Sequence, residues 1–336
     1  MLRLAINGYG RIGRSILRAL HESPRRGELE IVAINELADA RTVAHLTRYD
    51  STHGRFAGEV EQVEGALRID GRDIALTRSA EIEGLDWRSS GVDMVLECTG
   101  AFSDRATAEQ HLDRGAGRVL FSQPAQADVD ATIVYGVNHD VLKPEHRIVS
   151  AASCTTNGIV PVIQALYDAF KIECGTITTI HSAMNDQPVL DAYHDTDLRK
   201  TRSASQSIIP VDTELARGVE RVLPDSKGRL TAQALRVPTM DVSAMDLTVL
   251  VGRDVSEAEV NAALARAAAE DFCGVLGYTE EPLASCDFIH DPRSSVVDAA
   301  QTRVSGGRMV KVLTWFDNEW GYANRMLDVA AHWASL

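Results

Sequence analysis

The sequence has few cysteines, no excess of positive charge and no long apolar run, and each shortage excludes a class of protein. Its five cysteines are scattered without Cys-x-x-Cys spacing, which argues against a zinc site or a disulfide scaffold and is typical of a reducing cytoplasm. The net charge of −14 gives no general affinity for nucleic acid or acidic membranes. No segment is long and apolar enough to span a bilayer, and because Met1 leads straight into strand-like residues, no signal peptide is expected. Because the net charge is negative, any anion that the protein binds must be held by a local basic pocket.

A glycine-rich turn follows the first expected strand. Alternating apolar residues at 2–6 predict the strand, apolar spacing from 12 to 20 predicts a helix, and Gly-x-Gly-x-x-Gly at 8–13 lies between them. In that context the glycines permit a tight turn and let the backbone approach a diphosphate at the helix N-terminus. Glu36 ends a second expected strand roughly 20 residues further on, where a carboxylate accepts hydrogen bonds from ribose hydroxyls and repels a 2′-phosphate. The pattern predicts a unit that binds NAD rather than NADP.

The rest of the first half continues as short strands separated by helical segments, with strands expected at 92–98, 119–121, 133–137 and 147–150. This order predicts an α/β protein with a doubly wound parallel sheet of the Rossmann type, which binds ligands at the carboxyl ends of its strands. The residues expected to bind the cofactor lie at such ends or at the start of the first helix: Gly10, Arg11, Ile12, Gly13, Glu36, Thr99, Gly100 and Ser122. The last three could also be plain turn residues.

The second half has longer alternating segments, which predict a mainly antiparallel sheet in a domain of α+β type. Ser256 and Glu259 form a capping-box pattern that opens a helix reaching about residue 271. A polar loop at 185–207 is of a length that is usually functional. The strands are expected at 176–180, 230–237, 245–251 and 308–316.

Two domains are therefore expected, since 336 residues are enough for two cores. We predict an NAD-binding domain at 1–153 and a catalytic domain at 154–318. A final helix, at about 319–336, should pack back on the first domain.

Residues 151–161, Ala-Ala-Ser-Cys-Thr-Thr-Asn-Gly-Ile-Val-Pro, surround one thiol with small polar side chains. Ser153 is a good helix N-cap, and the apolar period continues to Leu166, so Cys154 should lie in the first turn of a helix. Free amides and the positive end of the helix dipole favour a nucleophilic thiolate there. A buried structural cysteine is the plain alternative, against which the polar neighbours argue. We interpret Cys154 as a nucleophile.

His181 follows the expected strand at 176–180 and opens the segment His-Ser-Ala-Met-Asn-Asp-Gln. A histidine near a thiol can take its proton, steady an ion pair and shuttle protons during turnover. Most histidines are instead structural and hydrogen-bonded, but the position of His181 at the carboxyl end of a strand favours the role of a general base.

The motifs around Cys154 and His181 resemble those of the glyceraldehyde-3-phosphate dehydrogenase family, as do 49–54, 235–239 and Asp-Asn-Glu-Trp-Gly-Tyr at 317–322. The resemblance implies that Cys154 is the nucleophile and His181 the base. It also implies that Arg236 binds the substrate phosphate, a role suited to the guanidinium fork, and that Asn318 holds the nicotinamide amide, with Tyr322 beside it. A homotetramer that acts on a small sugar phosphate, without metal, nucleic acid or membrane, is implied as well. The expected substrate-binding residues are Ser153, Thr155, Arg199, Lys200, Arg202, Thr213, Glu214 and Arg236.

Three positions depart from the phosphorylating members of the family. Gly158 replaces a second cysteine, Met184 replaces a threonine that donates to the substrate phosphate, and Glu214 replaces a glycine near the site of attacking inorganic phosphate. With Met184, the runs at 35–39 and 205–213 resemble the branch that oxidises D-erythrose 4-phosphate. That branch releases 4-phosphoerythronate by hydrolysis, in the route toward pyridoxal phosphate.

Two other functions stay open from the sequence. A phosphorylating enzyme of the same family would require inorganic phosphate for turnover. A non-catalytic NAD-binding interaction protein is a second alternative, against which the intact Cys154, His181 and Arg236 argue.

Glu36 is expected to set the choice of cofactor. Wild type should strongly prefer NAD, and Glu36→Ala should narrow the ratio of kcat/KM for NAD over NADP, because the carboxylate that repels a 2′-phosphate is lost. Steady-state kinetics with both cofactors measure this ratio. Equal use of NAD and NADP by wild type would contradict the assignment.

Overall fold

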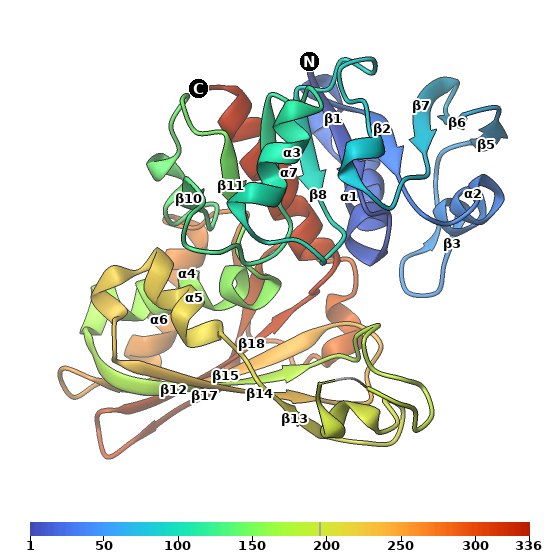
Figure 1. The fold of residues 1–336 in the computed structure, drawn as a ribbon. Helices are drawn as coiled ribbons and strands as arrows, with labels where there is room; N and C mark the ends of the chain where they lie inside the picture. Colours follow the sequence, from blue (N-terminus) through green and yellow to red (C-terminus); the bar gives the residue numbers. More distant parts are fainter. Residues whose placement is uncertain (195) are drawn as a thin grey trace. The chain divides into compact units, whose positions relative to one another are not determined.

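The computed structural model describes residues 1–194 and 196–336, which form two compact units (Figure 1). The first comprises Met1–Ser153 and Ala323–Leu336, and the second comprises Cys154–Tyr322. Among the described residues, no helix combines the length and apolarity that a membrane crossing requires.

The first unit contains a nine-stranded sheet in the order β10-β11-β9-β8-β1-β2-β7-β6-β5. Its strands are parallel from β10 to β7, and β6 and β5 add an antiparallel edge. This confirms the expected Rossmann-like sheet. The strands are β1 Leu2–Asn7, β2 Leu29–Asn35, β5 Val60–Val63, β6 Ala66–Ile69, β7 Arg72–Thr77, β8 Met94–Glu97, β9 Arg118–Phe121, β10 Ala131–Thr132 and β11 Ile148–Ser150, with β3 Tyr49–Asp50 and β4 Gly54–Arg55 forming a separate pair. The helices are α1 Arg11–Glu22, α2 Ala40–Arg48, α3 Arg105–Asp113 and α7 Trp320–Ala334.

Most of the last helix, α7, belongs to the first unit although it ends the chain. Asp328 accepts a hydrogen bond of 3.0 Å from Nε of Arg25, and the guanidinium of Arg118 lies 5.0 Å from the ring centre of Trp333. Trp333 is fully buried. These contacts, together with apolar burial, attach the helix to the parallel sheet.

The expectation of a strand at 133–137 was wrong. The pairing ends at Thr132, and the next residues form a turn around Gly136, whose φ is +90°. The side chain of Asn138 closes this turn: its Oδ1 accepts from the Val134 amide at 2.8 Å and its Nδ2 donates to the Thr132 carbonyl at 2.9 Å. Apolar alternation mimicked a strand here because a side chain, rather than a neighbouring strand, satisfies the backbone.

The second unit contains a seven-stranded sheet in the order β13-β14-β12-β15-β18-β17-β16. Only the β14–β12 and β17–β16 pairs are parallel, which confirms the expected mainly antiparallel sheet. Figure 1 shows α4, α5 and α6 on one face of this sheet. The elements are α4 Cys154–Phe170, β12 Ile172–His181, β13 Ile209–Val211, α5 Leu215–Val222, β14 Leu230–Arg236, β15 Ser243–Val251, α6 Glu257–Ala269, β16 Leu276–Thr279, β17 Ser295–Ser305 and β18 Met309–Phe316.

The helix with the capping box is present as α6, and both reciprocal bonds between Ser256 and Glu259 form. The loop after β12 is long, and its described residues include the short 3-10 helix Leu198–Thr201 before β13 begins. It therefore carries its polar residues on irregular backbone, beside the strand ends where the site is built.

Candidate active site

The glycine turn of the first unit brings β1, α1 and β8 into close contact. Gly8 has a φ of +91°, and a Cβ there would lie 2.6 Å from the Thr99 amide. A Cβ on Gly13 would lie 2.3 Å from the Gly8 carbonyl, whereas no atom is within 4 Å of that position on Gly10. The turn therefore leaves open space over the first residues of α1, where backbone amides face outward. A diphosphate fits such a cradle.

Beside the turn lies a cavity of about 350 Å³, whose wall contains Glu36, Gly10 and Thr99. Glu36 is held in place because its carboxylate accepts from the amides of Tyr9 at 2.8 Å and Leu37 at 2.7 Å. This combination of a fixed carboxylate and an apolar wall fits the adenosine half of a dinucleotide. The apolar wall is formed by Leu37, Ile82, Leu85, Ala101 and Phe102.

The other expected cofactor residues are distributed around this cavity rather than in its wall. Arg11 forms an ion pair with Asp50, Ile12 lies in the first turn of α1, and Gly100 has a φ of +74°. The amide of Ser122 donates to the Glu97 carbonyl at 3.0 Å, directly after β9. Gly13 packs against the turn, as described above.

A buried polar network beneath the cavity was missed by the sequence interpretation. Glu97, which is 1% exposed, accepts from Asn7 at 2.6 Å and from the Thr99 amide at 2.9 Å. His111 Nδ1 accepts from Trp87 Nε1 at 3.0 Å, so its Nε2–H donates to Glu97 at 3.1 Å. The network fixes the loop that begins at Thr99. A glutamate inside an otherwise apolar strand was the available signal.

The thiol of Cys154 faces His181 in the second unit. Cys154 is the first residue of α4, His181 is the last residue of β12, and Sγ lies 3.8 Å from Nε2. The Nδ1–H of His181 donates to the Ser182 carbonyl at 2.8 Å. This bond leaves the lone pair of Nε2 directed at the thiol, which is the orientation that a general base needs.

Burial decides the protonation of this pair. It raises the pKa of Cys154 to about 12; the amides of Thr155 and Cys154 oppose the rise, and the carboxylates of Glu319 and Asp317 add to it. Burial also lowers the pKa of His181 below 6.5. Desolvation therefore opposes the thiolate that the helix terminus was expected to favour, and it also disfavours the charged form of His181.

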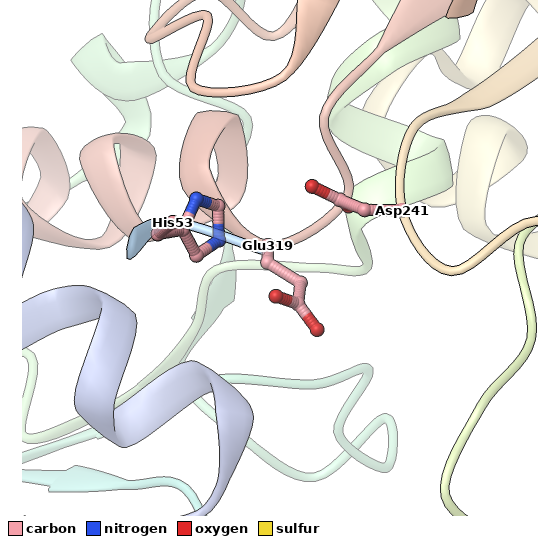
Figure 2. Close-up of side chains that lie close together, drawn as sticks. All are labelled: His53, Asp241 and Glu319. Atoms are coloured by element: carbon pink, nitrogen blue, oxygen red, sulfur yellow. The ribbon is translucent and has the colours of Figure 1, made fainter. Parts of the chain in front are cut away.

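Three carboxyl groups of the second unit lie close together, those of Asp241, Asp317 and Glu319. Figure 2 shows two of them, Asp241 and Glu319; the third side chain that it labels, His53, belongs to the first unit. Asp317 accepts from the amides of Glu319 at 2.9 Å and Trp320 at 2.7 Å. Burial raises the pKa of Asp241 to about 8, and the charges of Asp317 and Glu319 contribute to this rise. Asp241 therefore holds its proton near neutral pH.

Parallel pairing places Arg236 directly beside His181 at the ends of β14 and β12. Asn318 follows β18, and its Oδ1 accepts from the hydroxyls of Ser182 and Ser243, each at 2.9 Å. Because both bonds go to the oxygen, the amide nitrogen of Asn318 is left to donate elsewhere. Neither serine was predicted, because only the β12–β15 pairing brings them together.

The expected cations of the polar loop separate into two groups. Lys200 donates to Asp186 at 3.0 Å, and the same carboxylate binds Arg236, so Lys200 joins the site. Arg202 instead pairs with Asp191 at 2.9 Å and is 64% exposed, and Arg199 is exposed.

Glu214 lies at the start of α5 and is exposed to solvent. Its carboxylate is 71% exposed and pairs with Arg217 at 2.7 Å, so water and a cation screen its charge. Thr213 accepts from the Leu215 amide at 3.2 Å at the start of α5.

The residues that flank Cys154 are tightly packed. A side chain on Gly158 would meet Cε of Met245 at 2.6 Å, so Met245 fills the space that a second cysteine would need. Ser153 and Thr155 flank Cys154 directly in the sequence, and Tyr322 is buried in α7.

Comparison with known families gives two matches. Residues 2–105 match the NAD binding domain of glyceraldehyde 3-phosphate dehydrogenase, and residues 153–318 match the C-terminal domain of the same enzyme. The first match shows that the cofactor of this chain is NAD.

His181 should determine the acid side of the rate profile. Because its pKa is lowered below 6.5, the neutral imidazole persists at neutral pH, and kcat/KM should fall only below pH 6.5. His181→Asn should remove this acid limb and lower kcat by about 10²–10⁴. Initial rates from pH 5 to 9 measure both effects. An apparent pKa above 6.5, or an unchanged limb in the variant, would contradict the assignment.

Asp241 should make the fold less stable as pH rises. Its pKa is about 8 in the folded protein, against an ordinary value of 3.8 for an exposed aspartate, so the folded state binds more protons and loses stability between these values. Asp241→Asn removes this loss. The advantage of the variant in free energy of unfolding should grow by at least about 1 kcal/mol from pH 5 to pH 8 in urea titrations. Asp246→Asn, in the partly exposed pair with Lys311, is the control; equal pH trends in both variants would refute the prediction.

Proposed function

As the chain belongs to the glyceraldehyde 3-phosphate dehydrogenase family, it is an NAD-dependent oxidoreductase, and we propose that it is a D-erythrose-4-phosphate dehydrogenase. The observation that carries the covalent part of this proposal is the approach of Cys154 Sγ to His181 Nε2. The observation that supports the branch is Met184, whose Sδ lies 3.5 Å from Nη2 of Arg236, where phosphorylating relatives are expected to place a hydroxyl donor.

The residues of the first unit that suit the cofactor are the glycine turn, Glu36 and Thr99, and Asn318 of the second unit is suited to the nicotinamide amide. When bound, NAD supplies the acceptor for the hydride of the substrate. The protein binds and orients the cofactor, and the side chains of the protein carry out the proton transfers.

In the proposed mechanism, Sγ of Cys154 forms a bond to the aldehyde carbon while Nε2 of His181 removes the thiol proton. The histidine returns that proton to the oxygen, giving a hemithioacetal, and takes it again as the substrate carbon is oxidised to a thioester. Amides at the start of α4 stabilise the oxyanion, an effect typically worth ~3–4 kcal/mol.

Water then completes the reaction. His181 first releases to solvent the proton that it took from the hemithioacetal. The oxygen of water then bonds to the thioester carbon while His181 accepts a proton from it, and the C–S bond breaks. The histidine returns this proton to the sulfur, which restores the thiol, and the acid product ionises to 4-phosphoerythronate. The balance is one aldehyde, one NAD and one water converted to one carboxylate, one NADH and two protons.

A phosphorylating glyceraldehyde-3-phosphate dehydrogenase is the alternative, because the matched families carry that name. It differs in the acyl acceptor, since inorganic phosphate rather than water would cleave the thioester. We further propose a homotetramer in the cytoplasm, acting in the route toward pyridoxal 5′-phosphate. The free state of all five cysteines supports a reducing compartment.

A panel of aldehydes assayed with and without inorganic phosphate tests the proposal. Erythrose 4-phosphate should be oxidised without added phosphate, and glyceraldehyde 3-phosphate should have the lower kcat/KM. Cys154→Ser is the control and should retain less than a few per cent of the rate while still binding NAD, because an alcohol is a weaker nucleophile. NADH absorbance and product analysis report the outcome. Strict dependence on phosphate, with an acyl phosphate product, would return the protein to the phosphorylating enzymes.

A further inference from the structure

Arg236 is the buried cation of the second unit's site, and it is already paired. Its Nη1 donates to Oδ1 of Asp186 at 2.6 Å and its Nη2 donates to Oδ2 at 3.2 Å, while its side chain is 8% exposed. This two-point pairing occupies the guanidinium fork, which is the part that would otherwise bind a phosphate group.

The carboxylate of Asp186 also binds Lys200. Burial works against the charged form of Asp186, but the hydrogen bonds and charges of Arg236 and Lys200 outweigh it and lower its pKa. Asp186 therefore stays charged and joins two cations. The three groups together have a single net positive charge.

A short turn presents Asp186 to the two cations. The Ala183 amide donates to the Thr239 carbonyl at 2.8 Å, and the Gln187 amide donates to the Met184 carbonyl at 3.0 Å, so both sides of the turn are held. The position of the carboxylate is thus set by backbone bonds as well as by its ion pairs.

We propose that Asp186 is a specificity-determining residue that excludes inorganic phosphate from the thioester. This inference rests on the function proposed above. Phosphorolysis requires two phosphate groups in the site, the substrate's own and the attacking one, and each carries between one and two negative charges near neutral pH. A cluster with one net positive charge can hold the phosphate that Cys154 tethers through the substrate. Free phosphate must instead displace Asp186 from Arg236, and it is repelled by the negative charges of Asp186 and of the substrate's phosphate. Water therefore attacks the thioester instead.

The structure assigns this role to Asp186 rather than to Glu214. Both are carboxylates of the second unit, but the partner of Glu214 is the 81% exposed Arg217, whereas the partner of Asp186 is the buried Arg236 beside His181. Exposed pairs are screened by water, and partly buried ones are screened much less.

Asp186→Asn tests the inference, because it removes the charge at nearly constant size. Binding of inorganic phosphate, measured by isothermal titration calorimetry on the NAD-loaded protein, should tighten at least tenfold. With erythrose 4-phosphate as substrate, added phosphate should now yield an acyl phosphate, detected by ³¹P NMR.

Two variants serve as controls. Asp186→Glu keeps the charge, so it should bind inorganic phosphate as weakly as wild type does and should form no acyl phosphate. Glu173→Gln removes a carboxylate at the opposite end of β12, where it pairs with the partly exposed Arg308, and should change neither phosphate binding nor the product. Melting curves of each variant verify that it folds.

The outcomes separate the two proposals. If Asp186→Asn only raises KM for the sugar phosphate, or leaves phosphate binding and product unchanged, Asp186 merely positions Arg236 and the inference is overturned. If wild type itself forms an acyl phosphate, the proposed function and this inference both fail, and the wild-type product alone shows it.

Discussion

In the second unit, β12 and β14 run parallel and pair in register, so His181 and Arg236 lie side by side at the ends of their strands. Parallel neighbours point to the same face of a sheet, and a slip of one residue would turn Arg236 to the other face. β15 completes this edge, because its first residue, Ser243, helps to orient Asn318. His181, Arg236 and Asn318 are thus positioned by the backbone hydrogen bonds of one sheet.

Desolvation governs the chemistry at this edge. It raises the pKa values of Cys154 and Asp241 and lowers that of His181. The buried charge of Arg236 needs a partner for the same reason, and Asp186 supplies it. A helix terminus alone suggests a thiolate at Cys154, but burial raises the pKa of this thiol.

The first unit also contains a buried carboxyl group, and there hydrogen bonds rather than an ion pair with a cation satisfy it. Glu97 is buried among donors from Asn7, Thr99 and His111, and these fix the loop beside the glycine turn. Such a network stabilises one backbone arrangement because every member is satisfied. The cavity beside the glycine turn is therefore supported by a buried polar network within the parallel sheet, because Asn7 and Thr99 belong to both.

Local patterns in the sequence were enough to predict the glycine turn with its strand and helix, the capping box at Ser256 and the start of α4 at Cys154. Each depends on neighbours within a few residues, so propensity and spacing determine it. The same reasoning failed at 133–137, where the side chain of Asn138 replaced strand pairing, and it could not locate the partners of Glu97.

Tertiary structure decided which charges meet. Asp186 and Glu214 look alike as carboxylates of the second half, yet strand order brings only Asp186 to Arg236 and leaves Glu214 exposed beside Arg217. Likewise, Ser182 and Ser243 share Asn318 only because β12 pairs with β15. Contacts between residues far apart in the chain depend on register and burial, and these are properties of the packed sheet rather than of any local stretch of sequence.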